Sequence, residues 1–413
     1  MKLTGIGILD QALQQIAWMK LPSYRRFRLR YGERKARILR DYIIFPLFGI
    51  EKVSRLKGKV PYRIQEVYEV LRLLFRFPQL VRDVARSVLR QQVAVYYSLS
   101  AEERSRVKFT LIADDTYDPK TGQYQEGAAE LTDHHDGQVK KLYNPVVIYC
   151  RIDGLGEQLC FPLDLDVWQQ QKRQRRSRQG QTPGPIAHRK RWEIGKDMLA
   201  DILNFCRSIN FPFAQCDVAA DAAYCVEEFY DIVRAEPGLK FVTRPRRTHS
   251  FKIDGQQDSL HWHARDLKPH RWKRSAAFPW RYIKKKAFHK KYGECTILFY
   301  EVVTKTKSFV RFLVASTQNI RADALFKAFA RRWSIEVFFR NIKQVLAFRD
   351  YSGRKFRAVK AHYLLRLLTA IVMALLIRCF VKEPSCRAFL PRKITFGDMR
   401  SFIIEHYRFS QIC

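Results

Sequence analysis

The sequence lacks the patterns that identify several common classes of protein. Its nine cysteines form no C-x-x-C pair and lie mostly inside apolar runs, which favours reduced thiols over disulfides or zinc ligands. No G-x-x-x-x-G-K-[ST] motif and no G-x-S-x-G motif occurs. The sequence therefore indicates neither the phosphate-binding loop of an ATPase nor the nucleophile of a serine hydrolase.

Long apolar segments are also missing. The best candidate, residues 367–377, has 11 uncharged residues between Arg366 and Arg378, whereas a membrane span needs about 20. We expect this segment to be a buried helix. Residues 1–15 contain neither a long apolar core nor a small-residue cleavage site. No secretory signal is evident, and we expect a cytoplasmic protein without a membrane partner.

Acidic residues are few compared with basic ones. The chain of 413 residues has 40 Asp and Glu against 76 Lys and Arg, which gives a formal net charge of +36. Because this excess is far larger than solubility requires, it predicts a polyanionic partner. With no membrane span in view, double-stranded DNA is the first candidate, which would place the protein at the nucleoid.

The pattern of apolar and charged residues changes along the chain. Residues 1–105 look helical and basic, with arginines crowded among aromatics in 23–42 and a capping box formed by Ser100 and Glu103. We expect a basic helical DNA-binding region here. Within 106–191, the run 172–191 carries eight Lys or Arg and no acid. It is expected to be an arm that contacts DNA or is merely solvated.

Short strands and helices alternate after this first region. Strands are expected near 108–114, 142–154 and 157–165, followed by a helix from Trp192 to about Ile209, a strand ending at Asp221, a helix from Ala222 and a strand near 239–247. This order predicts an α/β domain in which one strand lies parallel to the first. We assign 106–247 and 318–382 to this domain, 248–317 to a β-rich insertion with a hairpin around residues 304–307, and 383–413 to a C-terminal tail.

Residues 329–346 form an apolar helical pattern that contains five charged residues. At 100° per residue, four side chains fall within roughly 40° of Glu336: Phe329, Arg332, Arg340 and Lys343. The flanks are apolar, including Trp333 and Val337, so we expect a buried helix with one narrow charged stripe. Arginines four residues from a glutamate are often ordinary helix ion pairs. The stripe therefore acquires a functional meaning only if other carboxylates meet it.

Aspartates stand at the two strand ends that should lie side by side. Asp114 and Asp115 end the first strand, while Asp217 lies inside the later strand and Asp221 ends it. In open α/β sheets, ligands and chemistry are found at the carboxyl ends of the strands. Two aspartates with Glu336 would make an all-oxygen ligand set that suits Mg²⁺ or Mn²⁺. Two such ions can drive in-line phosphoryl transfer.

These motifs resemble those of the DDE transposases of bacterial insertion sequences. The likeness covers about 108–380 and is to the branch whose third motif is Tyr-x2-Arg-x3-Glu-x6-Lys. Here that motif reads Phe329-x2-Arg332-x3-Glu336-x6-Lys343, with phenylalanine in place of tyrosine. The Asp-x-Thr motif is matched by Asp114-Asp115-Thr116, and the second aspartate motif by Asp221-Ala222-Ala223-Tyr224.

The resemblance implies a ribonuclease H-like mixed sheet with a β-rich insertion and an N-terminal helical domain. It implies that Asp114, Asp221 and Glu336 are catalytic and hold two Mg²⁺ or Mn²⁺ ions, with Asp115 as the rival of Asp114. Asp217 is the weaker rival of Asp221. The enzyme would bind the terminal repeats of its mobile element, cut the DNA and join the 3′-hydroxyl ends to target DNA, as a homodimer.

The resemblance also implies residues that contact the DNA. Arg332, Lys343 and, more weakly, Arg340 would grip phosphates, and Phe329 would lack the hydroxyl of the usual tyrosine. A tryptophan of the insertion can stack on a flipped base in related enzymes; Trp262, Trp272 and Trp280 are the candidates, although packing in the core is the commoner role. Two alternatives stay open, an inactive transposase-derived DNA-binding protein and a metal-dependent nuclease without strand transfer.

Overall fold

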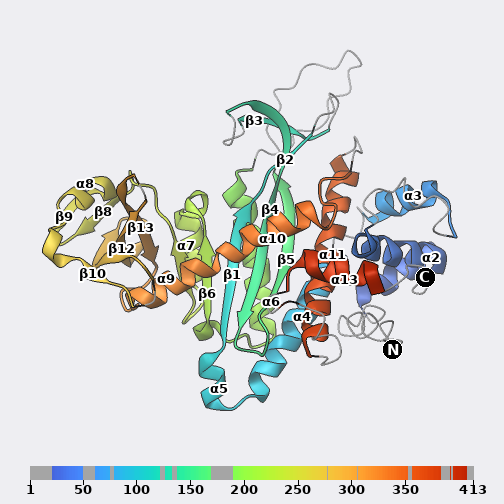
Figure 1. Ribbon diagram of the computed structural model, residues 1–413, viewed down its shortest axis with the longest axis horizontal. Helices are drawn as coiled ribbons and strands as arrows, with labels where there is room; N and C mark the ends of the chain where they lie inside the picture. Colours follow the sequence, from blue (N-terminus) through green and yellow to red (C-terminus); the bar gives the residue numbers. More distant parts are fainter. Residues whose placement is uncertain are drawn as a thin grey trace.

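A mixed β-sheet with helices around it forms the centre of the molecule (Figure 1). The computed structural model describes residues 21–49, 61–74, 79–120, 126–132, 137–168, 189–276, 278–304, 306–351, 356–382, 391 and 394–406. Most of the basic run 172–191 lies outside these residues, and only Arg189, Lys190 and Arg191 belong to them.

The sheet is built on five strands: β1 (Lys108–Asp115), β4 (Val139–Asp153), β5 (Leu159–Trp168), β6 (Cys216–Ala220) and β7 (Lys240–Thr243). They lie in the order β5-β4-β1-β6-β7. β1 is parallel to β6 and β6 to β7, while β4 is antiparallel to β1 and β5. This is the ribonuclease H-like arrangement, and the predicted fold class and the parallel crossover are confirmed.

Smaller elements complete this part of the fold. They are β2 (Asp118–Pro119), β3 (Ala129–Thr132), α6 (Arg191–Ser208), η4 (Phe213–Gln215), η5 (Ala222–Tyr224) and α7 (Glu227–Arg234). The prediction of a helix from Ala222 was wrong in its start. Asp221 opens one short 3₁₀ turn, and the α-helix begins five residues later at Glu227.

The sheet continues beyond β7 into the strand-rich segment. The strands are β8 (Ser250–Ile253), β9 (Gln256–Ser259), β10 (Lys273–Arg274), β11 (Arg281–His289), β12 (Gly293–Val303) and β13 (Ser308–Ala315), with α8 (Leu260–Arg265) and η6 (Pro269–Arg271) between them. β13 pairs with β7 and with β12, so the predicted hairpin is confirmed and belongs to the same sheet as β1. A second apolar cluster, which includes Leu298, Tyr300 and Phe326, lies here.

Two consecutive helices, α9 (Ala322–Arg331) and α10 (Trp333–Gln344), run diagonally across the sheet as one rod (Figure 1). The predicted single helix is interrupted at Arg332. Here the backbone hydrogen bonds join residues three apart instead of four apart, although Arg332 itself keeps right-handed helical angles. Trp333 is 55% exposed and Val337 38% exposed. The prediction that both flanks of the stripe are buried was therefore wrong on this side.

The N-terminal helices share a hydrophobic core with the sheet. They are α2 (Pro22–Ile44), η2 (Phe45–Phe48), α3 (Ile64–Leu74), α4 (Gln79–Ser98) and α5 (Ala101–Arg106). α2 bends at Gly32, whose φ of 84° only glycine adopts readily. Side chains from α2, α3 and α4 belong to the same buried cluster as β1, β4 and β5. The capping box at Ser100 and Glu103 is confirmed.

The apolar segment 367–377 lies within α11 (Phe356–Lys382), which runs beside the sheet, and α13 (Phe396–His406) packs nearby. By length and composition alone α11 could cross a membrane, but 78% of its most apolar window is buried inside the molecule. It packs on β5 and on α2, α3 and α4. The prediction of a buried core helix is confirmed.

His362 of α11 joins three parts of this core. Its Nε2 lies 3.0 Å from the carbonyl oxygen of Ala347 and 3.2 Å from that of Phe348, and its Nδ1 lies 2.9 Å from the hydroxyl of Tyr42. Because carbonyls only accept hydrogen bonds, Nε2 carries the proton and Nδ1 accepts from Tyr42. Full burial, helped by the nearby charge of Arg366, holds the pKa of His362 well below its usual value.

We expect His362 to make the protein acid-sensitive. Since its pKa is lower in the folded than in the unfolded state, the unfolded chain binds the extra proton, and the free energy of unfolding falls as pH drops below about 6.5, by up to roughly 1.4 kcal/mol per pH unit. Urea denaturation at pH 7.5 and 5.5 should show a smaller pH effect in His362→Gln than in wild type. Parallel losses in the two proteins would contradict this role.

Candidate active site

The sheet register places two of the predicted acids side by side. The last paired residues of the parallel strands β1 and β6 are Ala113 and Ala220. Asp114 and Asp221 follow them directly, so both stand at the carboxyl edge of adjacent strands. Asp221 continues into the turn η5, and its backbone oxygen accepts a hydrogen bond from the Thr243 hydroxyl at 3.2 Å.

Arg332 links the first aspartate to the predicted glutamate. Its Nη1 donates to Asp114 Oδ2 at 2.8 Å, and its Nη2 donates to Glu336 Oε1 one turn further along the helix. The side chains of Arg332 and Asp114 are only 12% and 13% exposed. Two carboxylates from distant parts of the chain thus share one guanidinium at the edge of the sheet.

The electrostatics of Asp114 follow from this arrangement. Burial raises the pKa of Asp114 to about 7; Arg332 opposes the shift, while the neighbouring charges of Asp115 and Asp221 add to it. The pKa of Arg332 is raised by its three carboxylate neighbours, Asp114, Glu336 and Asp221, although burial opposes this. Asp221 therefore also lies within electrostatic reach of the same guanidinium.

Asp115, the rival of Asp114, points to different partners. Its carboxylate accepts from Asn144 Nδ2 at 2.8 Å, from Arg191 Nη1 at 2.9 Å and from the Tyr224 hydroxyl at 3.3 Å. Successive residues of a strand face opposite sides, so Asp115 turns away from Glu336 when Asp114 faces it. Asp115 holds together β4, the start of α6 and η5.

Asp217, the rival of Asp221, is also engaged elsewhere. It lies inside β6, and Arg331 approaches it at 3.5 Å while pairing with Asp153 at 3.2 Å. Arg331 and Arg332 are adjacent in sequence but serve different acids. Asp217 is thus held in a separate ion-pair cluster, four residues before the strand end where Asp221 stands.

The other residues of the charged stripe differ in their surroundings. Lys343 Nζ donates to the hydroxyl of Thr116, two residues after Asp114, and burial lowers the pKa of this lysine to about 8. The guanidinium of Arg332 lies over the Phe329 ring, 5.4 Å from its centroid. Arg340 is exposed. Arg332 and Lys343 therefore flank the first aspartate, and Arg340 faces solvent.

The predicted tryptophans of the strand-rich segment are packed to different degrees. Trp280 stacks on Phe278, with ring centroids 5.1 Å apart and an interplanar angle of 5°, and Trp272 is half-buried beneath Arg281. Trp262 is 51% exposed, with the Arg265 guanidinium 4.7 Å from its ring centroid. Base stacking by Trp272 or Trp280 stays a prediction, and Trp262 is the more accessible ring.

Two known protein families match overlapping parts of the chain. Residues 197–373 match the family described as transposase DDE domain, and residues 82–283 match the DDE superfamily endonuclease. The chain belongs to the DDE transposases. The first match includes Asp221 and Glu336, and the second includes Asp114 and Asp221. No curated protein matches the chain.

Membership in the DDE transposases makes the protein a nuclease-type enzyme of a superfamily that uses divalent metals, with DNA as the partner that the family suggests. The acids of this site offer only oxygen donors, which suits such ions. Within the described residues no three His, Cys, Asp or Glu side chains stand ready around one point to hold a metal. The guanidinium of Arg332 lies between two of the acids instead, with its Nε buried and unpartnered.

Sequence reasoning missed the residues that hold the site in place. Asn144, Arg191 and Tyr224 come from three elements, and no spacing relates them. The sequence indicated Tyr224 only as the aromatic residue of a motif. The contact of its hydroxyl with Asp115 depends on close packing of its ring against Gly195. A Cβ at Gly195 of α6 would lie 2.8 Å from Tyr224 Cε1. Only a glycine leaves room for the Tyr224 ring, whose hydroxyl reaches Asp115.

We expect Gly195→Ala to destabilise the protein by about 1–3 kcal/mol through overpacking, less the helix propensity that alanine restores, about 1 kcal/mol. Cleavage should also fall, because Tyr224 is displaced from Asp115. Gly397→Ala in α13 is the matched control, since its new Cβ would meet only Thr395 Oγ1 at 3.5 Å. Thermal melting checks both; equal melting temperatures for the two variants would contradict the close contact.

Proposed function

We propose that the chain is the transposase of a bacterial insertion sequence, of the branch with the Tyr-x2-Arg-x3-Glu-x6-Lys motif. It would bind the terminal repeats of its element, cut the DNA and join the 3′-hydroxyl ends to target DNA. The observation that carries this proposal is the meeting of Asp114 and Glu336 on Arg332, beside Asp221. These three acids are the proposed catalytic and metal-binding residues.

The proposed mechanism assigns each residue a task. Two bound Mg²⁺ or Mn²⁺ ions would supply activation of the attacking oxygen and stabilisation of the leaving oxygen. Asp114, Asp221 and Glu336 provide the oxygen donors. Their negative charge repels DNA phosphates unless a cation offsets it. Arg332 is paired with Asp114 and Glu336 and offsets part of their negative charge before DNA arrives. Once released it can bind a phosphate, as can Lys343.

The reaction proceeds in two steps in this proposal. Water attacks the phosphodiester at the element end first, and the bond to the 3′-oxygen breaks. The freed 3′-hydroxyl then attacks a target phosphodiester and displaces its 3′-oxygen, so the number of phosphodiester bonds is unchanged in the second step. Cutting two ends together favours a homodimer on DNA.

The proposed domains follow the same logic. We propose that 1–105 is the DNA-binding helical region, that 106–247 with 318–382 is the catalytic domain, that 248–317 is a β-rich insertion and that 383–413 is the tail. Support for the helical region comes from α2, which buries Tyr24 and Phe27 and exposes all of its arginines except Arg40. Support for the insertion comes from a second apolar cluster, which its strands β12 and β13 form together with α9 and β7 of the proposed catalytic domain. We place the enzyme at the bacterial nucleoid.

The test is an assay that separates joining from cutting. A labelled duplex that carries the terminal sequence of the element is incubated with the protein, Mg²⁺ and an unlabelled supercoiled plasmid. Label joined covalently to the plasmid supports a transposase. Cutting without joining would instead identify a nuclease, and salt-sensitive binding without cutting in Mg²⁺ or Mn²⁺ would identify an inactive DNA-binding protein.

A further inference from the structure

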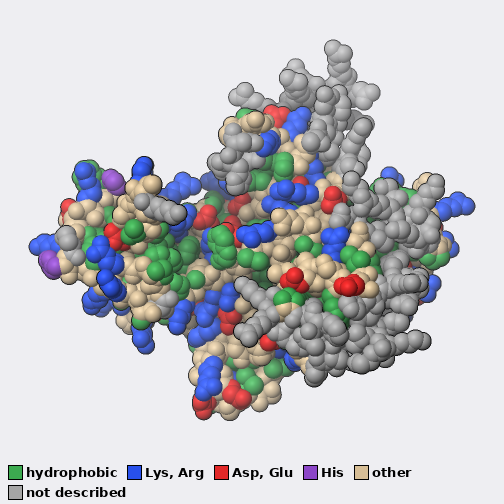
Figure 2. All heavy atoms as spheres, viewed as in Figure 1, with side chains coloured by type: hydrophobic (Ala, Val, Ile, Leu, Met, Phe, Trp, Pro, Cys, Tyr) green, Lys and Arg blue, Asp and Glu red, His purple; other side chains and the backbone are tan. Residues whose placement is uncertain are grey.

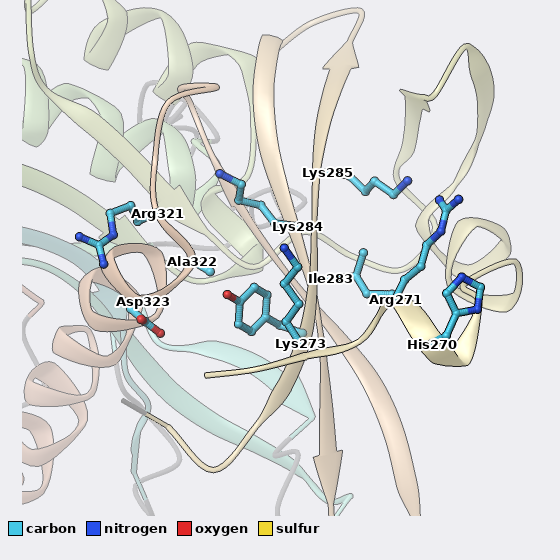
Figure 3. A pocket seen from close by; sticks show the side chains of 10 residues that line it. His270, Arg271, Lys273, Ile283, Lys284, Lys285, Arg321, Ala322 and Asp323 are labelled. Carbon is cyan, nitrogen blue, oxygen red and sulfur yellow. The ribbon is translucent and has the colours of Figure 1, made fainter. Parts of the chain in front are cut away.

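A basic groove lies in the strand-rich end of the molecule, separate from the proposed catalytic acids. Its volume is about 600 Å³. The residues come from three segments, η6 to β10, β11 and the start of α9, and surround one hollow (Figure 3). The lining residues are His270, Arg271, Lys273, Tyr282, Ile283, Lys284, Lys285, Arg321, Ala322 and Asp323. We call this the β11 groove.

Positive charge in the β11 groove is largely uncompensated. Five Lys or Arg and one aspartate line it. Lys285 pairs with Asp254, and Lys284 Nζ donates to the backbone oxygen of Ile320 at 3.1 Å, which leaves its charge without a partner. In the described part of the chain, no carboxylate pairs with the three remaining cations: Arg271, Lys273 and Arg321. The space-filling view shows Lys and Arg side chains over much of this end of the molecule (Figure 2).

The chemistry of the lining selects phosphate rather than bases. Guanidinium and ammonium groups bind phosphate oxygens well. The lining contains no Asn or Gln, the side chains that read adenine edges, and its arginines come from different segments. Such a surface positions a nucleic-acid backbone without reading its sequence.

The rod of α9 and α10 connects the β11 groove to the catalytic acids. Arg332 and Lys343 reach from this rod to Asp114 and Thr116. Arg321 caps the N-terminal end of α9, 11 residues before Arg332. These 11 residues span about 16 Å along α9. Since a DNA strand advances about 3.4 Å per nucleotide, Arg321 lies roughly five nucleotides from Arg332.

We propose that the β11 groove is a second DNA contact, which binds the phosphate backbone of the duplex roughly five base pairs from the reacting bond, independently of sequence. The proposal rests on the proposed function for the position of the reacting bond. The backbone passes from the groove along α9 to the acids beside Arg332. The groove thus fixes the direction in which bound DNA leaves the catalytic site.

The test compares two variants that lose the same charge. The groove variant is Lys273→Gln, Lys284→Gln, Arg321→Gln; the control is Lys252→Gln, Arg265→Gln, Lys290→Gln, three exposed residues of the same strand-rich end. Fluorescence anisotropy measures the affinity for a duplex with the element end as a function of salt. Each lost phosphate contact lowers the slope of log K against log[salt] by about 0.9, so the groove variant should lose about 2 to 3 and the control less than 1.

Trimming the duplex locates the contact. On the side of the reacting bond that reaches the groove, shortening the DNA to about three base pairs should give wild type and groove variant equal affinities. Shortening the DNA on the other side should leave the difference in affinity unchanged. Equal slopes for both variants, or a difference that survives trimming of either side, would overturn the proposal. The proposal would also be overturned if the groove variant lost affinity for tripolyphosphate but bound DNA like wild type. That result would identify the groove as a site for small anions.

The readouts separate this proposal from the proposed function. Anisotropy needs no cleavage. If the protein never cuts DNA but the salt slopes of the two variants differ, the proposal for the β11 groove stands and the catalytic proposal fails. If both variants cleave and join DNA and show wild-type salt slopes, the catalytic proposal stands and the proposal for the β11 groove fails. Circular dichroism confirms that each variant is folded before binding is compared.

Discussion

Glu336→Gln is expected to abolish cleavage of the element end, with a loss of roughly a thousandfold or more, the scale of losing a preorganised electrostatic contact. Glutamine keeps the size of the side chain but removes the negative charge that is proposed to hold a metal. Arg332 would then retain only Asp114 as an ionic partner. Single-turnover cleavage of a labelled duplex in Mg²⁺ measures the effect, while DNA affinity should stay within a few-fold of wild type.

The adjacent aspartates provide a control for this prediction within the same strand. Asp114→Asn should be as damaging to cleavage as Glu336→Gln. Asp115→Asn should mainly lower the melting temperature, because Asp115 pairs with Arg191 and fastens three elements. Full cleavage by Glu336→Gln would remove the glutamate from the proposed machinery. Inactive but fully stable Asp115→Asn would make Asp115 the catalytic acid.

Arg332→Gln is expected to tighten Mn²⁺ binding in the absence of DNA by about ten- to a hundredfold. The reason is that Arg332 is paired with both Asp114 and Glu336 and offsets part of the negative charge that would attract the ion. Charges about 4 Å apart interact by about 4 kcal/mol at intermediate dielectric, and releasing even half of this is more than a tenfold effect. Titration calorimetry with Mn²⁺ measures the affinity directly and does not depend on activity.

The same substitution should reduce cleavage, since Arg332 is also proposed to bind phosphate. Tighter metal binding together with slower cutting is the distinctive result. Arg340→Gln is the matched control, because it removes the same charge from an exposed position of the same helix and should leave Mn²⁺ affinity unchanged. Weaker Mn²⁺ binding by Arg332→Gln would mean that the arginine orients the acids for the metal instead of competing with it.

The parts of the fold that depend on local patterns were predictable. Alternating and apolar strand patterns gave β1, β4, β5, β12 and β13 within a few residues. Strand ends could be located from the aspartates, and the parallel crossover then brought Asp114 next to Asp221. The pairing of Arg332 with Glu336 also followed from helical spacing, since the two residues are one turn apart.

The parts that depend on distant contacts were not predictable from spacing. Nothing local connects Arg332 to Asp114, which is 218 residues away in the sequence. The exposure of Trp333 depends on which elements cover α10, and the periodicity of α10 cannot reveal its neighbours. The sequence pattern does not indicate the break at Arg332 either, because the backbone angles there stay helical and only the hydrogen-bond partners change.

The burial of α11 has a consequence for how the protein is made. This helix is apolar enough to be taken for a membrane anchor, and α2, α3 and α4, which pack on it, precede it in the chain. During translation these helices leave the ribosome first, so the cover of α11 exists before α11 emerges. A gene copy that loses its 5′ end would yield a polypeptide in which the side of α11 that packs on α2, α3 and α4 is uncovered, and we expect such a product to aggregate or to be misdirected to the lipid bilayer.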